Sequence, residues 1–120
     1  MGDGEDFRPL SDLEMSHLTK LLSVDFPGRD ELMKQTQTIC ACQIDPNGSL
    51  GFRPGPSKAE SAKVVRRIPV EAELLDDDGV TIHVLLHVVD GYLSELEIYR
   101  DDSDRVRREL APEDFSLVVL

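Results

Sequence analysis

The sequence contains no tryptophan and has only two tyrosines and four phenylalanines among its 120 residues. A core made by this chain must therefore consist mainly of Leu, Val and Ile. The sequence also lacks an apolar run of the length that crosses a membrane. Its acidic N-terminus has no apolar segment like that of a signal peptide. These absences predict a cytoplasmic protein that does not bind membranes.

Cysteine is equally scarce, and the two cysteines are Cys40 and Cys42. On a β-strand this spacing places both side chains on one face, and residues so close in sequence rarely form a disulfide. No further pair of Cys or His residues completes the usual pattern of zinc ligands. We therefore expect both cysteines to be small apolar residues, and we predict neither a metal nor a cofactor from them.

Basic residues are few: 13 Lys and Arg stand against 24 Asp and Glu, which gives a net charge of −11. A surface of this charge repels the phosphates of nucleic acids and anionic lipids. It attracts proteins with basic surfaces and accelerates encounter with them. The charge would equally serve solubility alone. We expect a basic protein or a second copy of this chain as partner, and no nucleic acid.

The length predicts one domain, with residues 1–10 as a flexible tail and residues 11–120 as a single α+β domain. The capping-box pattern that starts at Ser11 and ends at Glu14 predicts the beginning of a helix, which the apolar stripe extends to about Ser23. A second helix is predicted over residues 29–37.

Strands are predicted over residues 38–44 and 49–52, and a three-stranded meander over residues 68–99. In the meander the even-numbered positions are apolar from Ile68 to Ile98, so they belong on the core face. The predicted fold is α+β, with two N-terminal helices packed on one face of an antiparallel sheet of about five strands. Residues 116–120 either dock on this body or add a strand.

The alternation of even and odd positions also predicts the register. Directly opposed residues lie on the same face, so each hairpin must pair even-numbered with even-numbered residues. Three-residue loops ending in glycine, at residues 77–79 and 89–91, meet this condition. The odd positions then form the outer face, with Glu73, His83 and Glu97 in one row. Glu71, Leu85 and Glu95 form the next row, and His87 lies beside Leu93.

This outer face carries the one group of side chains suited to metal binding or acid–base chemistry. Its members are Glu71, Glu73, His83, Leu85, His87, Glu95 and Glu97. Three interpretations stay open: a Glu–His–Glu site for a metal or general base, a solvated sheet face with Glu–His pairs, or an interface. No motif for a nucleophile or for phosphate binding is found. The run Asp76-Asp77-Asp78-Gly79 lacks the ligand spacing of a calcium loop. We therefore predict no catalytic residues, and we expect a non-enzymatic protein rather than an enzyme.

Three stretches carry a resemblance: residues 26–32 (FPGRDEL), residues 47–50 (NGSL) and the meander with the RDD that follows it. Together they resemble a small bacterial family of domains of unknown function, over about residues 8–102. More loosely, the chain is similar to small acidic immunity proteins that neutralise toxins. The expected function is an acidic interaction module, for example an inhibitor of this immunity type; a small metal-binding or hydrolytic domain and a homodimerising structural domain are the alternatives.

Overall fold

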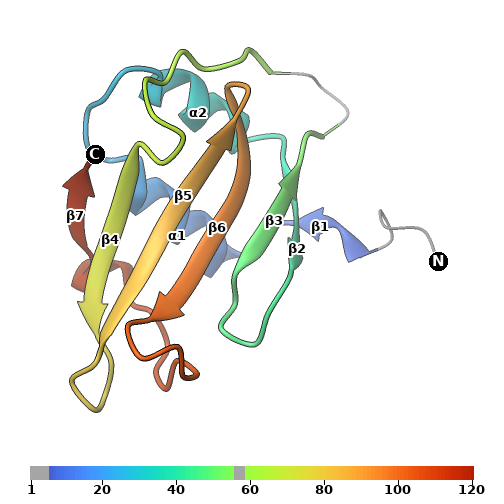
Figure 1. Ribbon diagram of the computed structural model, residues 1–120. Helices are drawn as coiled ribbons and strands as arrows, with labels where there is room; N and C mark the ends of the chain where they lie inside the picture. Colours follow the sequence, from blue (N-terminus) through green and yellow to red (C-terminus); the bar gives the residue numbers. More distant parts are fainter. Residues whose placement is uncertain (1–5, 56–58) are drawn as a thin grey trace.

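The computed structural model describes residues 6–55 and 59–120. In this part of the chain, two α-helices lie on one side of a seven-stranded antiparallel sheet (Figure 1). The helices are α1 (Asp12–Leu21) and α2 (Arg29–Gln35), and a short 3-10 helix, η2, spans Pro112–Asp114. The strands are β1 (Arg8–Pro9), β2 (Cys40–Gln43), β3 (Leu50–Arg53), β4 (Val70–Leu75), β5 (Thr81–Val89), β6 (Tyr92–Arg100) and β7 (Ser116–Val119).

The strands follow the order β1-β2-β3-β6-β5-β4-β7 across the sheet. The predicted α+β architecture is therefore correct, but the predicted number of about five strands is wrong, because seven are present in the described residues. The two extra strands lie at the edges of the sheet. β1 comes from the segment assigned to the N-terminal tail, whose residues 1–5 lie outside the described part of the chain. β1 contains two residues, one of them proline, and so it is too short to show the alternation of apolar and polar residues that predicts a strand.

β7 is the other edge strand, and it pairs with β4, with Ser116 opposite Glu73 and Val119 opposite Val70. From the sequence, two arrangements were predicted for residues 116–120: docking on the body of the domain, or an added strand. Its apolar run does not alternate with polar residues, and an alternating pattern is what distinguishes a half-buried strand from other apolar segments.

Helix α1 begins where the sequence predicts. The Ser11 hydroxyl accepts from the Glu14 amide, and the Glu14 carboxylate accepts from the Ser11 amide. Arg8 holds the same carboxylate with two hydrogen bonds of 2.7 and 2.8 Å. This arrangement ties β1 to the start of α1. The hydrogen bond from Arg8, only partly opposed by burial, lowers the pKa of Glu14.

The core lies between the helices and the even-numbered face of β4, β5 and β6. Leu18, Leu21 and Leu32 of the helices are fully buried, as are Ile82 and Val84 of β5. The parity argument therefore assigns the two faces of the meander correctly. It also gives the correct register for the first hairpin, because Ala72 lies opposite Val84 and Leu74 opposite Ile82.

The second hairpin differs from its predicted register by two residues. Val89 pairs with Tyr92, so the loop contains only Asp90 and Gly91, which both have positive φ (53° and 85°). A two-residue turn with positive φ at both positions matches the twist of the strands. A bulge between His87 and Val88 then restores the parity of the two faces. As a result Val84 lies opposite Ile98, where Leu96 was predicted.

Gln35, at the end of α2, fixes this hairpin against the helices. Its Nε2 donates to the carbonyls of Glu60 and Gly91, and its Oε1 accepts from the Leu93 amide, each at 2.9 Å. The side chain is buried, with 2% of the residue exposed. It thereby gives the Leu93 amide beside the bulge a partner and joins α2 to the β5–β6 turn.

Candidate functional site

The face of the sheet away from α1 and α2, which we call the open face, carries the candidate residues. Figure 1 shows β4, β5 and β6 side by side on this face, with no helix in front of them. The odd positions of these strands point to it, as predicted. These are the positions of Glu71, Glu73, His83, Leu85, His87, Glu95 and Glu97.

The shifted register changes which of these residues are neighbours. His83 lies between Glu73 and Tyr99, so the predicted row of Glu73, His83 and Glu97 does not form. Glu97 instead lies opposite Leu85, and Glu95 lies opposite His87. The predicted place of Leu93 beside His87 is also wrong. Because of the bulge, Leu93 pairs with Val88 and is buried in the core.

His83 stands at the centre of a group of three carboxylates. Its Nε2 lies 2.5 Å from Oδ1 of Asp101, and since a carboxylate only accepts, Nε2 carries the hydrogen. Its Nδ1 lies 3.6 Å from Oε2 of Glu71 and 3.7 Å from Oε2 of Glu73. The Tyr99 ring stacks on the imidazole, with centroids 4.9 Å apart and planes inclined by 16°. The ring of His83 is thus held in position although it lies on an exposed sheet.

His87 forms a second group with Glu95 and Glu97. Its Nε2 donates to Oε1 of Glu97 at 2.8 Å. Its Nδ1 is buried and has no hydrogen-bond partner within the described part of the chain. In both groups the ligand atoms of one His and two Glu lie within 4.8 Å of one another. The two groups differ in that two glutamates lie within 3.7 Å of Nδ1 of His83, whereas among the described residues only Glu97 of the second group lies as close to His87.

The carboxylates on the open face act on Tyr99, whose side chain lies among them. Partial burial first, and then the negative charges of Glu71, Glu97 and Asp101, raise the pKa of the Tyr99 phenol. A raised phenol pKa means that this face disfavours a further negative charge. Leu85 lies half-buried between Glu71 and Glu97 and gives the acidic surface an apolar centre.

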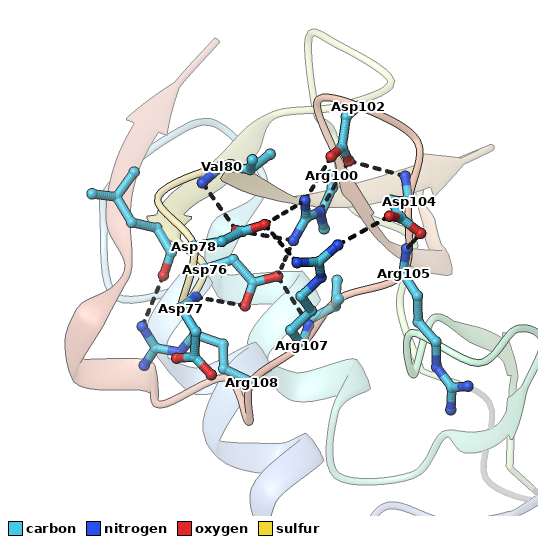
Figure 2. A network of polar contacts seen from close by, with 12 residues as sticks. Asp76, Asp77, Asp78, Val80, Arg100, Asp102, Asp104, Arg105, Arg107 and Arg108 are labelled. Atoms are coloured by element: carbon cyan, nitrogen blue, oxygen red, sulfur yellow. Dashed lines mark hydrogen bonds and ion pairs between the residues drawn. The ribbon is translucent and has the colours of Figure 1, made fainter.

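A buried ionic network lies at the end of the sheet where the β4–β5 hairpin turns (Figure 2). Arg100 is at its centre and is 1% exposed. Its guanidinium donates to Asp76 at 2.8 Å, to Asp78 at 3.1 and 3.0 Å, and to Asp102 at 2.9 and 2.6 Å. Arg107 adds an ion pair to Asp78 at 3.0 Å. The sequence predicted only a loop at residues 77–79, and this network was not predicted.

These contacts shift the acidities of the network. Burial alone would raise the pKa of Asp76, but hydrogen bonds from the amides of Arg107 and Asp77 and from Arg100 outweigh it and lower that pKa. Hydrogen bonds from Arg100 likewise lower the pKa of Asp78 and of Asp102. The same bonds raise the pKa of Arg100. Each member therefore stays charged at neutral pH, and the network joins the β4–β5 turn to the segment after β6.

A hollow of about 220 Å³ lies beside α1 and is lined by both His17 and Arg108. His17 is buried, with only 6% of the residue exposed. Its Nε2 donates to the Leu110 carbonyl at 2.7 Å, and its ring stacks on Phe115. Because His17 is used in packing, this hollow is a weaker candidate than the open face.

The model of a family described as a domain of unknown function (DUF6984) matches residues 7–110. The chain belongs to this family. The resemblance seen in the sequence, to a small family of domains of unknown function, is thereby confirmed. No curated protein and no solved structure matches the chain.

The DUF6984 match includes β1, both helices and the strands from β2 to β6. It therefore covers both His–Glu–Glu groups and the Arg100 network. The match ends before η2 and β7. No helix of the described residues is long and apolar enough to span a membrane.

Proposed function

We propose that this DUF6984 domain is a non-enzymatic interaction module that binds a basic protein through its open face. One observation carries the proposal: carboxylates from adjacent strands surround Leu85 and Tyr99 on the face that no helix covers. These carboxylates belong to Glu71, Glu73, Glu95, Glu97 and Asp101. An apolar centre with a charged rim is the usual composition of a protein interface.

The charge of the chain supports a basic partner. With a net charge of −11, the domain attracts positive surfaces over a range of about 8 Å at physiological ionic strength. A basic toxin is a partner of this chemistry, in which case the domain would act as its inhibitor. A toxin reading frame next to the gene for this chain would support that form of the proposal, and inhibition of its product by the purified domain would test it.

The experiment compares two variants of equal net charge. Glu73→Lys with Glu97→Lys reverses charges on the open face, where the two side chains are 47% and 39% exposed. Asp25→Lys with Glu113→Lys makes the same change on the helix side, at the α1–α2 loop and in η2. We expect a basic protein from the source cells to bind both the wild-type domain and the helix-side variant. Its binding to the open-face variant should be lost, and its binding to the wild-type domain should be lost in about 0.5 M NaCl.

Equal capture by the two variants would contradict the proposal. Light scattering on the purified domain tests the alternative of a homodimer. A monomer is expected, and a dimer that dissociates in the variant with Glu73→Lys and Glu97→Lys would assign the open face to self-association instead.

A further inference from the structure

We propose that Glu71, Glu73 and His83 bind one divalent transition-metal ion of the Zn²⁺ class on the open face. This inference concerns an ion and goes beyond the protein interaction proposed above, so each proposal can fail alone. It rests on the orientation of the His83 ring and on the spacing of the three ligand atoms.

The two nitrogens of His83 have different surroundings. Nε2 donates its hydrogen to Asp101, so in the neutral imidazole Nδ1 carries a lone pair. That lone pair faces Oε2 of Glu71 at 3.6 Å and Oε2 of Glu73 at 3.7 Å. Three electron-rich atoms therefore converge on one point, and a cation at that point would stabilise them.

The distances fit a shared ion better than a hydrogen bond from Nδ1. A proton on Nδ1 would draw one carboxylate oxygen to the length of a charge-assisted hydrogen bond, about 2.8 Å. Instead both oxygens lie almost equally far from Nδ1. In a tetrahedral site with bonds of about 2.1 Å, two ligand atoms are about 3.4 Å apart. The observed spacing is close to that of two ligands on one ion.

The surroundings of His83 also have the form of a metal site. Metal-binding histidines almost always donate their second ring N–H to a carboxylate or carbonyl, which fixes the tautomer and the ring orientation. Asp101 accepts that hydrogen here, and the stacked ring of Tyr99 holds the imidazole plane. An imidazole with two carboxylates suits ions such as Zn²⁺. Since Glu73 is 47% exposed, water can complete the coordination.

The neighbouring His87 group provides the matched control. It contains the same residue types, with ligand atoms within the same 4.8 Å of one another. Its Nε2, however, already donates to Glu97, and its Nδ1 is buried without a hydrogen-bond partner among the described residues. Within this part of the chain, two glutamates lie at ion-pair distance from the His83 ring and only Glu97 lies that close to the His87 ring, so we assign the ion to the His83 group.

The test is calorimetric titration of the full chain with ZnCl₂, together with thermal unfolding in the presence and absence of Zn²⁺. We expect one ion per chain and a higher Tm with Zn²⁺. His83→Gln and Glu71→Gln should each weaken binding about 100-fold or more, and Asp101→Asn about 10-fold, because it acts only through His83. His87→Gln should bind Zn²⁺ as the wild-type chain does. Circular dichroism verifies that each variant is folded, and the Glu71→Gln result stands if His83→Gln does not fold.

Co²⁺ separates this site from the two cysteines. A visible Co²⁺ spectrum without a thiolate charge-transfer band, unchanged in Cys42→Ser, supports nitrogen and oxygen ligands. Three results would overturn the proposal: no heat and no change in Tm with the wild-type chain, equal binding by His83→Gln and Glu71→Gln, or loss of binding in Cys42→Ser or His87→Gln.

Discussion

Nη1 of Arg100 lies 2.8 Å from Oδ2 of Asp76, and the two side chains are almost completely buried, at 1% and 0% exposed. Asp76 also accepts from the amides of Asp77 and Arg107. A buried charge of this kind is tolerated only while its partners remain in place. The pair therefore makes the β4–β5 turn and the segment after β6 dependent on one another.

Asp76→Asn is expected to destabilise the domain by about 2–3 kcal/mol, because an amide cannot accept from all three donors and leaves Arg100 with less compensating charge. Asp77→Asn is the control, since Asp77 is an exposed neighbour in the same turn. It should change the free energy of unfolding by less than about 0.5 kcal/mol. Urea unfolding of both variants measures the difference, and equal midpoints would show that the buried pair contributes nothing.

Acid should unfold the protein through this network. The folded-state pKa values of Asp76, Asp78 and Asp102 lie below the ordinary value of 3.8. Groups with lowered pKa values contribute stability that is fully present above the unfolded-state value and is lost as the pH falls through the folded-state value. We expect Tm to be nearly constant from neutral pH to about pH 5 and to fall steeply below about pH 4. In Asp76→Asn the fall should be shallower; a parallel fall would assign the acid sensitivity to other carboxylates.

Two glycines with similar backbone angles should respond differently to substitution by alanine. A Cβ at Gly79 (φ +87°) would have no neighbouring atom within 4 Å, whereas a Cβ at Gly91 (φ +85°) would lie 2.8 Å from the Ala62 carbonyl oxygen. Gly79→Ala should cost only the strain of a left-handed residue, about 1–2 kcal/mol. Gly91→Ala adds an overpacking cost and should reach about 3 kcal/mol or more.

Thermal unfolding of these two variants checks the difference. Both variants carry the strain of a left-handed residue. The difference between their losses of stability therefore reports the contact between the β5–β6 turn and the segment around Ala62. That segment is joined to the turn by a hydrogen bond of 2.7 Å from the Ala62 amide to the Gly91 carbonyl. Equal losses of stability in the two variants would mean that the segment moves aside without cost.

The faces of the sheet were predictable from the sequence, and the exact neighbours were not. Alternation of apolar and polar residues fixes which side of the sheet a residue occupies, and this assignment holds for all seven candidate residues. It does not fix the register, because a two-residue turn followed by a bulge preserves the same parity as a three-residue loop. Tyr99 therefore takes the place opposite His83 that Glu97 was predicted to hold.

The Arg100 network shows a second limit of sequence patterns. Arg100 continues the even-numbered series that ends at Ile98, so parity alone assigns it to the core side. A charged residue at such a position signals a buried ion pair, since a lone buried charge is too costly. The run of aspartates at 76–78 then supplies its partners. The pairing itself depends on tertiary contacts between residues about 24 apart, which no local period encodes.

Tyr99 offers a direct measurement of the potential on the open face. Burial and the surrounding carboxylates raise the pKa of its phenol above the ordinary value of 10.0. Tyr92 is the other tyrosine, so a Tyr92→Phe background isolates Tyr99 in an absorbance titration of phenolate formation. We expect Tyr99 to titrate at a higher pH than free tyrosine. Glu71→Gln and Glu97→Gln should each lower the apparent pKa, because each removes a negative charge that opposes the phenolate.

The control for this titration is Glu113→Gln, which removes the same charge from η2 on the helix side of the molecule. It should leave the Tyr99 titration unchanged, since charges separated by more than a Debye length are largely screened. The size of the two Gln effects on the open face would then report how much of the shift comes from charge and how much from burial. An equal response to Glu113→Gln would show that net charge, and not the carboxylates grouped around His83, sets the potential at Tyr99.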